Sequence, residues 1–152
     1  VFQRFPDYPM VIEIKQESPS MAEPFCALIR KYNMSEKVLV PSFSDQAINE
    51  FREACPEVAT AASSAEVRNF NIANFLLATN LLNPAYQAFQ VPEESGGFPV
   101  VIPHFVNSAR DHNLQVHIWT INEAADMKRF LEMGVDGIMT DRPDILMELL
   151  GR

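Results

Sequence analysis

The sequence predicts an α/β fold in which parallel strands alternate with helices. Short runs rich in β-branched residues recur along the chain, and each is followed by a segment with helical hydrophobic spacing. Parallel neighbours need crossover connections of this length. No Gly-x-Gly-x-x-Gly or Walker-type loop follows a strand, and polar or aromatic residues recur where strands end. These last two observations favour a closed barrel over an open nucleotide-binding sheet, because strand ends converge on one rim of a barrel.

The first half of the chain contains three of the expected strand–helix units. Branched residues predict the strands, and apolar residues spaced at helical intervals predict the helices between them. Ser44 or Asp45 is placed to cap the second helix, and Pro56 ends it. The expected strands are 10–15, 38–43 and 58–61, and the expected helices are 21–33, one carrying residues 47–55, and 64–78 with a further short element after it.

The second half supplies three more units. Pro103 opens a helix at a position that tolerates a missing N–H, and Asn113 closes it. Asn122 is expected to cap the next helix, and Gly134 stands where a left-handed C-terminal residue is needed. The expected strands are 85–91, 116–119 and 135–140, with a loop at 92–99 and a closing helix at 145–150. We therefore expect about six strand–helix units in a single domain covering residues 1–152.

Composition narrows the class of partner and the compartment. Twelve Lys and Arg residues against twenty Asp and Glu residues give a net charge of −8, which disfavours a nucleic-acid partner. No apolar run approaches the roughly 20 residues of a membrane span, and no signal-peptide layout is present. We expect a soluble chain, cytoplasmic rather than secreted, with the compartment left open. Cys26 and Cys55 fall in apolar helical patterns and are expected to be buried thiols without a disulfide or zinc site.

The chain opens on Val1, which is not a natural start, and it enters a strand-like run almost at once. We therefore expect a processed or truncated polypeptide.

Glu13 and Lys15 are the first candidates for chemistry. They are two residues apart on one expected strand, so they face the same side. A carboxylate inside a barrel needs a cation, which would be Lys15 or a metal ion. Two readings stay open at this point. One is an ordinary Glu–Lys contact on an exposed face, and the other is a metal-ligand carboxylate beside a phosphate-binding ammonium.

The ends of the last two expected strands carry a second set of candidates. Trp119 is the only tryptophan; it either packs in the core or forms a platform for a substrate. The segment Thr140-Asp141-Arg142-Pro143 is expected to cap the final helix and to pair Asp141 with Arg142, with Asp141 left open for a further role. The three histidines, of which only His117 shares a strand side with Trp119, form no ligand spacing: His104, His112 and His117.

Taken together, these segments resemble one known family. Ile12-Glu13-Ile14-Lys15, Ser42-Phe43, Trp119-Thr120-Ile121-Asn122 and the run 134–143, in this order and spacing, are similar to the glycerophosphodiester phosphodiesterases. The resemblance implies a TIM-barrel (β/α)₈ fold and hydrolysis of glycerophosphodiesters to an alcohol and glycerol 3-phosphate. It also implies a divalent cation, Ca²⁺ or Mg²⁺. By position, Glu13 matches a metal ligand, Lys15 a phosphate-contacting lysine and Trp119 a substrate-lining tryptophan, with Phe43 and either Gln87 or Phe89 also lining the pocket.

The departures from that family are as informative as the match. The family's His-Arg-Gly strand, its Glu-x-Asp strand and a downstream histidine, which supply the acid/base groups and other metal carboxylates, have no counterpart here. The resemblance thus implies strands three to eight of the barrel, without one and two. The metal site would be incomplete, since Ca²⁺ takes six to eight oxygens. We expect the chain alone to be inactive or nearly so, and its unpaired edges to favour self-association or to need the missing N-terminal segment.

Two further readings remain as alternatives to the enzyme fragment. One is a catalytically dead relative that binds a phosphodiester or a protein partner as a regulatory module. The other, more remote, is a different phosphate-binding barrel enzyme. The sequence upstream of Val1 would separate the first of these from the enzyme.

Overall fold

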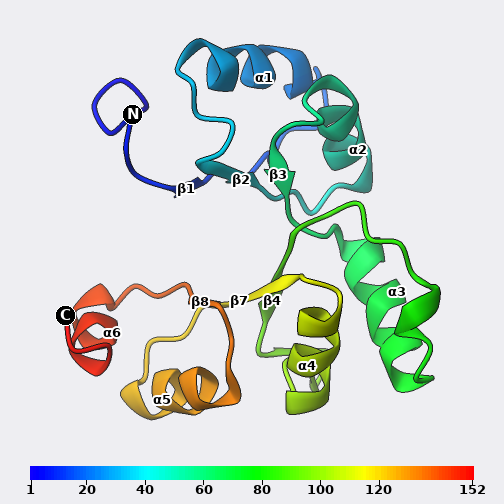
Figure 1. Ribbon diagram of the computed structural model, residues 1–152, viewed down its shortest axis with the longest axis vertical. Helices are drawn as coiled ribbons and strands as arrows, with labels where there is room; N and C mark the ends of the chain where they lie inside the picture. The colour runs from blue at the N-terminus through cyan, green and yellow to red at the C-terminus, as the bar shows by residue number, and fades with distance from the viewer. The chain divides into compact units, whose positions relative to one another are not determined.

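The computed structural model describes residues 1–152 and divides them into two compact units. Unit 1 comprises Val1–Asn69 and Pro84–Gln87, and unit 2 comprises Phe70–Asn83 and Ala88–Arg152. Each unit contains its own three-stranded parallel sheet (Figure 1). The α/β class with parallel strands is confirmed, whereas a closed sheet of six strands is not, because the two sheets are separate and open. The single-domain expectation stays a prediction.

The sheet of unit 1 has the strand order β1-β2-β3. Its ladder continues beyond the assigned strands, because Ile12 N–H donates to Leu39 O at 3.1 Å and Ile14 N–H donates to Pro41 O at 3.0 Å. The extended run predicted from Met10 to Lys15 is therefore confirmed as far as Ile14. The strands are β1 (Met10–Val11), β2 (Val38–Val40) and β3 (Ala59–Thr60).

Helices α1 and α2 supply the rest of the unit 1 core. Ser44 caps α2, since its hydroxyl accepts the Ala47 N–H at 3.2 Å, and one of the two predicted caps is thereby confirmed. Phe51 and Ile29, on opposite helices, are fully buried. The helices are α1 (Ala22–Lys31), α2 (Asp45–Ala54) and α3 (Ser64–Phe75), the last of which contributes residues to both units.

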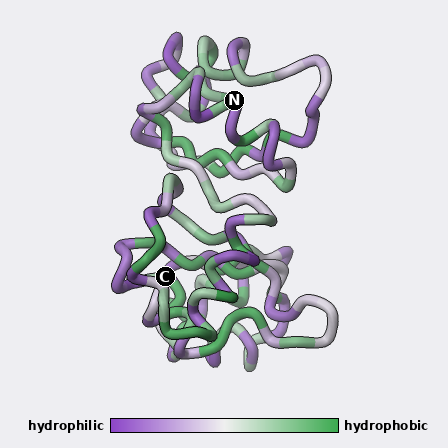
Figure 2. Tube along the Cα trace, turned by 90° about the vertical axis from the view of Figure 1, so that its right-hand side faces the viewer, coloured by the Kyte–Doolittle hydropathy of each residue, from purple (hydrophilic) through white to green (hydrophobic).

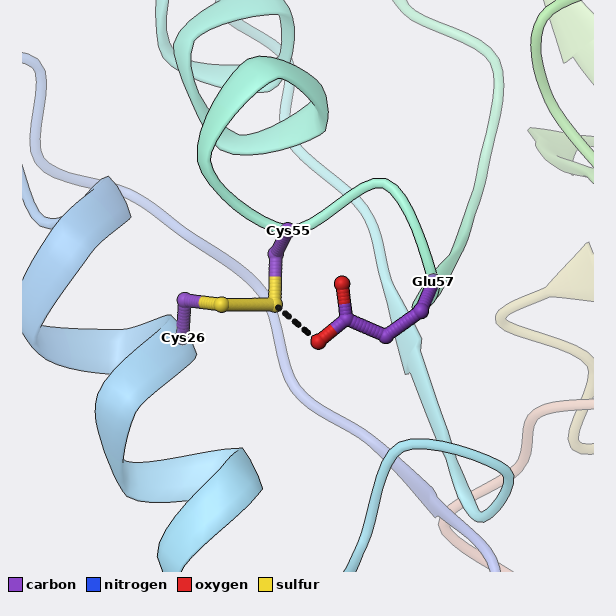
Figure 3. A group of neighbouring side chains, drawn as sticks. All are labelled: Cys26, Cys55 and Glu57. Atoms are coloured by element: carbon purple, nitrogen blue, oxygen red, sulfur yellow. Dashed lines mark hydrogen bonds between the residues drawn. A yellow bond between two sulfur atoms is a disulfide. The ribbon is translucent and has the colours of Figure 1, made fainter.

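The expectation that Cys26 and Cys55 are free thiols is wrong. Both are fully buried, as predicted, but a disulfide joins them, with 5.6 Å between their Cα atoms (Figure 3). Cys26 lies in α1 and Cys55 is the C-terminal cap of α2. Their separation of 29 residues gives no hint of this pairing. It arises because α1 and α2 pack together, which brings the two positions within disulfide range.

An arginine in the last turn of α2 holds the same end of the helix in place. Arg52 donates to both carboxylate oxygens of Glu66, at 2.7 and 3.0 Å, and to the hydroxyl of Thr60 at 2.9 Å. Glu66 also accepts the Ser63 N–H at 2.8 Å while Ser63 Oγ accepts the Glu66 N–H at 3.3 Å, which is a capping box at the start of α3. One guanidinium thus ties α2 to β3 and to the first turn of α3.

The sheet of unit 2 has the order β4-β7-β8. His117 of β7 pairs with Gly137 of β8, and a Cβ at Gly137 would approach His117 Cδ2 to 2.8 Å. The imidazole therefore requires a residue without a side chain beside it. The strands are β4 (Ala88–Pro92), β7 (Gln115–Trp119) and β8 (Gly137–Ile138).

The stretch expected as a loop at 92–99 contains a hairpin instead. Strands β5 (Glu94–Ser95) and β6 (Phe98–Pro99) pair antiparallel across Gly96 and Gly97, whose φ values are 60° and 79°. Two residues with positive φ form the tight turn that suits the twist of a hairpin. The Gly-Gly pair that predicts a loop in the sequence is the turn of this hairpin.

Unit 2 contains a cluster of buried aromatic rings. Phe70, Phe89 and Phe105 are fully buried, with ring centroids 4.7 to 5.6 Å apart. Gly134 ends α5 with φ 87°, as predicted. Hydrophobic and hydrophilic stretches alternate along the chain of both units, as expected for elements with one buried face (Figure 2). The elements are η1 (Thr79–Leu81), α4 (Pro103–Asp111), α5 (Ala124–Met133) and α6 (Pro143–Leu149).

No helix in the structure combines the length and apolar character that a membrane crossing requires.

The disulfide leads to a prediction about stability. Replacing both Cys26 and Cys55 by Ala should lower the free energy of unfolding by about 3–4 kcal/mol, as loop-closure entropy gives for a bridge of this span. Urea denaturation with and without dithiothreitol measures it. The unmodified chain should lose stability in the reductant, and the double variant should not respond to it. An equal response of both would contradict the bridge.

Candidate functional site

A cleft of about 520 Å³ lies where β1 and β2 end in unit 1. Parallel strands bring their carboxyl ends to the same edge, so both strand exits contribute to its wall. The cleft combines charged, hydroxyl and aromatic groups, which is the mixture expected of a polar ligand site. Its lining consists of Glu13, Ile14, Lys15, Glu17, Ser42, Phe43 and Ser44.

Lys15 and Glu13 form an ion pair in this cleft. Lys15 Nζ lies 2.9 Å from Glu13 Oε2, and the Lys15 side chain is 77% exposed against 27% for Glu13. An exposed pair of this kind contributes at most about 1 kcal/mol. The ammonium is therefore held weakly and can turn toward an anion that enters the cleft. The period-two spacing of the two residues correctly predicts that they share a side.

Hydrogen bonds at the β2 exit fix the position of Phe43. The Ser42 hydroxyl donates to Ile14 O at 2.7 Å, and Ser44 N–H donates back to Ser42 Oγ at 3.2 Å. Ser44 is itself the cap of α2. Phe43 stands between two anchored serines and is 60% exposed, so its ring faces the cleft without being part of the core.

Glu17 is a cleft residue that sequence reasoning missed. It follows Glu13 and Lys15 at the same spacing of two, which could have identified it. Its turn is fixed on both sides, because Gln16 Nε2 donates to Pro19 O at 2.7 Å and Ser20 Oγ donates to Glu50 at 2.6 Å. The cleft therefore contains two carboxylates and one ammonium.

A second cluster of polar groups lies at the exits of β7 and β8 in unit 2. Asn122 Oδ1 accepts the Thr140 hydroxyl at 3.0 Å and the Asp141 N–H at 2.9 Å, and Asn122 Nδ2 donates to Asp141 Oδ2 at 3.1 Å. The expectation that Asn122 caps the following helix is wrong. The N-terminal cap of α5 is Glu123, without a side-chain hydrogen bond, because the amide of Asn122 is used between the strands.

Arg142 does not pair with Asp141, contrary to expectation. Its guanidinium donates to both carboxylate oxygens of Asp144, at 2.7 and 3.0 Å, while Asp141 is bonded to Asn122. The Arg142 guanidinium lowers the pKa of the Asp144 carboxyl. These contacts lie at the start of α6, where Pro143 takes the first helical position. The segment 140–143 thus makes structural contacts, as expected, but Asp141 and Arg142 each bond to a residue other than the one predicted.

The histidines lie outside the cleft lining. His117 is partly buried in unit 2, where Gln90 Nε2 lies 3.4 Å from its Nδ1. Burial lowers the pKa of His117, and the nearby Asp136 carboxylate opposes this by a smaller amount. His104 Nε2 lies 3.4 Å from Asn74 O, and His112 packs edge-on against the Phe70 ring. None of the three lines the cleft.

Phe89 and Gln87 are placed by packing and backbone pairing. Phe89 is fully buried in the aromatic core of unit 2, so its ring offers no surface to a ligand in this structure. Gln87 belongs to unit 1, where its Oε1 accepts the Thr60 N–H at 2.8 Å and its N–H donates to Thr60 O at 2.9 Å. We do not carry either residue into the candidate site. Trp119 stands partly buried at the end of β7.

The cleft does not contain a complete set of ligands for a hard divalent cation. Ca²⁺ takes six to eight oxygens, and Mg²⁺ requires a near-octahedral set. Glu13 and Glu17 offer carboxylates, but Glu13 is bonded to Lys15. The hydroxyl of Ser42 donates to a backbone carbonyl, and that of Ser44 caps a helix. These side chains alone do not fit a bound cation.

One cluster elsewhere has the composition of a metal site. Atoms of Cys26, Cys55 and Glu57 lie within 4.8 Å of one another. The disulfide removes both thiolates as ligands, and Arg30 donates to both oxygens of Glu57, at 2.6 and 3.0 Å. The Glu57 carboxylate lies 3.8 Å from the Cys55 sulfur, and it points toward the disulfide (Figure 3). This cluster is a structural link between α1 and α2.

Comparison with known proteins identifies the relatives of this chain. The model of the glycerophosphoryl diester phosphodiesterase family matches residues 1–145. A probable glycerophosphodiester phosphodiesterase 2 of Mycobacterium tuberculosis is 33% identical over 154 residues, covering 95% of this chain and 56% of its own length. A human lysophospholipase D, GDPD3, is 22% identical and covers 99% of this chain and 54% of its own length. The chain thus spans little more than half of these relatives.

Solved structures share the fold. A glycerophosphodiester phosphodiesterase from Agrobacterium tumefaciens superposes with a TM-score of 0.72 at 17% identity, over 99% of this chain and 60% of its own. The arrangement of strands and helices is therefore that of known phosphodiesterases over the part that this chain covers.

The shifted pKa of His117 predicts a pH dependence of stability. The folded state keeps the imidazole neutral below the ordinary pKa of about 6.5, whereas the unfolded state binds the proton there. The free energy of unfolding should therefore fall as the pH drops below about 6.5, until the folded pKa is passed, with a contribution no steeper than ~1.4 kcal/mol per pH unit.

Urea unfolding between pH 7.5 and 5 tests this with His117→Leu, which should flatten that part of the profile. His104→Leu serves as the control, since it replaces a histidine outside this site. Identical profiles for the unmodified chain and His117→Leu would rule out the effect.

Proposed function

The chain belongs to the glycerophosphoryl diester phosphodiesterase family, and from this premise we propose that it is part of an enzyme that hydrolyses glycerophosphodiesters to an alcohol and glycerol 3-phosphate. The observation that carries the proposal is the Glu13–Lys15 pair in a cleft at the β1 exit, within the residues that the family model matches. A phosphodiester is a small anion, and an exposed ammonium in a cleft is suited to bind it.

The reaction requires two catalytic contributions from the protein. Negative charge on the phosphoryl oxygens must be offset, and the departing alkoxide must receive a proton. We assign the stabilisation of negative charge to Lys15. Its weak ion pair with Glu13 can break when a phosphate oxygen takes the place of the carboxylate. Phe43 would cover an apolar part of the substrate from the neighbouring strand exit. Trp119 keeps its substrate-lining role as part of the proposal.

We assign protonation of the alkoxide to no group of the cleft. Its lining contains no histidine, Glu13 is engaged with Lys15, and no hydrogen bond directs the remaining carboxylate, Glu17, toward the position of a leaving group. The family resemblance implies a divalent cation that would draw charge from the phosphoryl group, with Glu13 among its ligands. The donors present do not complete such a shell, so we route no step through it. We propose that these 152 residues alone do not turn substrate over.

A binding module without catalysis is the second candidate. The Glu13–Lys15 pair also favours this candidate, because a cleft that contains the Lys15 ammonium and no histidine can bind a phosphodiester without cleaving it. The name of the human relative extends the substrates to be tested to lysophospholipids. Turnover by a chain extended with the segment that the longer relatives have before the matched region would decide between the candidates.

The proposal predicts a large effect of Lys15. In a chain extended by the preceding segment of the M. tuberculosis relative, Lys15→Met should lower the rate of glycerol 3-phosphate release by about a hundredfold, the usual scale for losing one preorganised charge-stabilising group. Glu13→Gln should reduce the activation by Ca²⁺ or Mg²⁺. Enzyme-coupled detection of glycerol 3-phosphate gives both rates.

The control is Lys31→Met, which removes an exposed lysine of α1 outside the cleft. Full activity of the Lys15 variant would remove this residue from the site. Binding of glycerophosphocholine by the extended chain without any product would favour the binding module.

A further inference from the structure

We propose that Asn122 is a positioning residue that holds the segment carrying Trp119 against the exit of β8. The inference concerns unit 2 alone. The substrate-facing part of this role rests on the proposed function, since Trp119 matters to a substrate only if it lines the pocket. The mechanical part rests on hydrogen bonds within the unit.

Asn122 uses three of its side-chain hydrogen-bonding positions on one neighbouring segment. Its Oδ1 accepts from Thr140 Oγ1 at 3.0 Å and from the Asp141 N–H at 2.9 Å, and its Nδ2 donates to Asp141 Oδ2 at 3.1 Å. A backbone N–H can only donate and a carboxylate can only accept, so the orientation of the amide is determined by its partners. No other uncharged side chain of this length offers both an acceptor and a donor in this arrangement.

The three side-chain hydrogen bonds of Asn122, called the clamp below, begin where the backbone hydrogen bonds between the two strands end. Met139 N–H donates to Ile118 O at 2.8 Å, and Ile121 N–H donates to Met139 O at 3.0 Å, so Trp119 lies between two ladder bonds. Beyond Met139 the connection between the two strand exits passes to the side chain of Asn122. Trp119 and the β8 exit are thereby held as one body.

The same network reaches the last helix. Thr140 Oγ1 donates to Asn122 and accepts the Arg142 N–H at 2.9 Å, just before Pro143 starts α6. The amide of Asn122 thus connects the β7 exit, the β8 exit and the first turn of α6. Loosening it should free the tryptophan segment without touching the hydrophobic core.

The test uses fluorescence, because Trp119 is the only tryptophan of the chain and needs no turnover to report. Asn122→Asp keeps the acceptor but loses the donor and places a second carboxylate against Asp141. It should raise the acrylamide quenching constant of Trp119 on the order of twofold, as local opening exposes the ring. The exchanged pair Asn122→Asp with Asp141→Asn restores a donor and an acceptor, and should return quenching to the original value.

Asn107→Asp is the matched control, since it makes the same change on an exposed face of α4. If Asn122→Asp fails to fold, Asp141→Ala removes one of the three bonds and should give a smaller increase. Unchanged quenching in Asn122→Asp, or no recovery in the exchanged pair, would overturn the clamp.

Kinetics of the extended chain separate the two parts of the inference. A rise of KM in Asn122→Asp that exceeds the fall of kcat, recovered in the exchanged pair, supports the clamp as a device for placing Trp119 on substrate. A recovered quenching effect with unchanged KM upholds the clamp and overturns the substrate role of Trp119.

Discussion

Parallel pairing is the constraint on which the rest of the structure depends. In the three-stranded sheet of each unit the strands run in one direction, so their carboxyl ends meet at a single edge. The unit 1 residues to which we assign a role line a cleft at such an exit: Glu13 and Lys15 after β1, and Phe43 after β2. The exits of unit 2 carry Trp119 and Asn122. The parallel fold places the carboxyl ends of the strands at one edge of the sheet, and the residues at that edge determine which ligands it can bind.

Features that depend on neighbours in sequence could be predicted. The cap at Ser44, the left-handed Gly134 and the shared side of Glu13 and Lys15 follow from local geometry, and the structure has all three. The parallel α/β class follows from the alternation of strand and helix patterns. The Gly96-Gly97 hairpin is equally local, but a glycine pair is typical of loops as well as of hairpin turns, so the expectation for 92–99 stopped at a loop.

Features that depend on packing could not be predicted. The bond between Cys26 and Cys55 exists because α1 and α2 lie together, and spacing along the chain does not encode that. Asn122 is a residue type that often caps helices. Its side-chain amide is instead hydrogen-bonded to Thr140 and Asp141 on the neighbouring strand exit, so it does not cap α5. Arg142 pairs with Asp144, two residues further along the chain, and not with the adjacent Asp141. In the candidate site, the shared side of Glu13 and Lys15 could be predicted from their spacing, whereas the position of Glu17 in the same cleft became clear only from the structure.

The disulfide closes a covalent ring that contains the second part of α1, β2 and all of α2. When the ends of the chain are pulled apart, the 29-residue separation between Cys26 and Cys55 is hidden from the force. At about 3.3–3.6 Å per extended residue, the oxidised chain is shorter at full stretch by roughly 100 Å than the reduced one. Part of the cleft wall, including Phe43, lies inside this ring and would not be extended by the force, whereas Glu13 and Lys15 lie outside it.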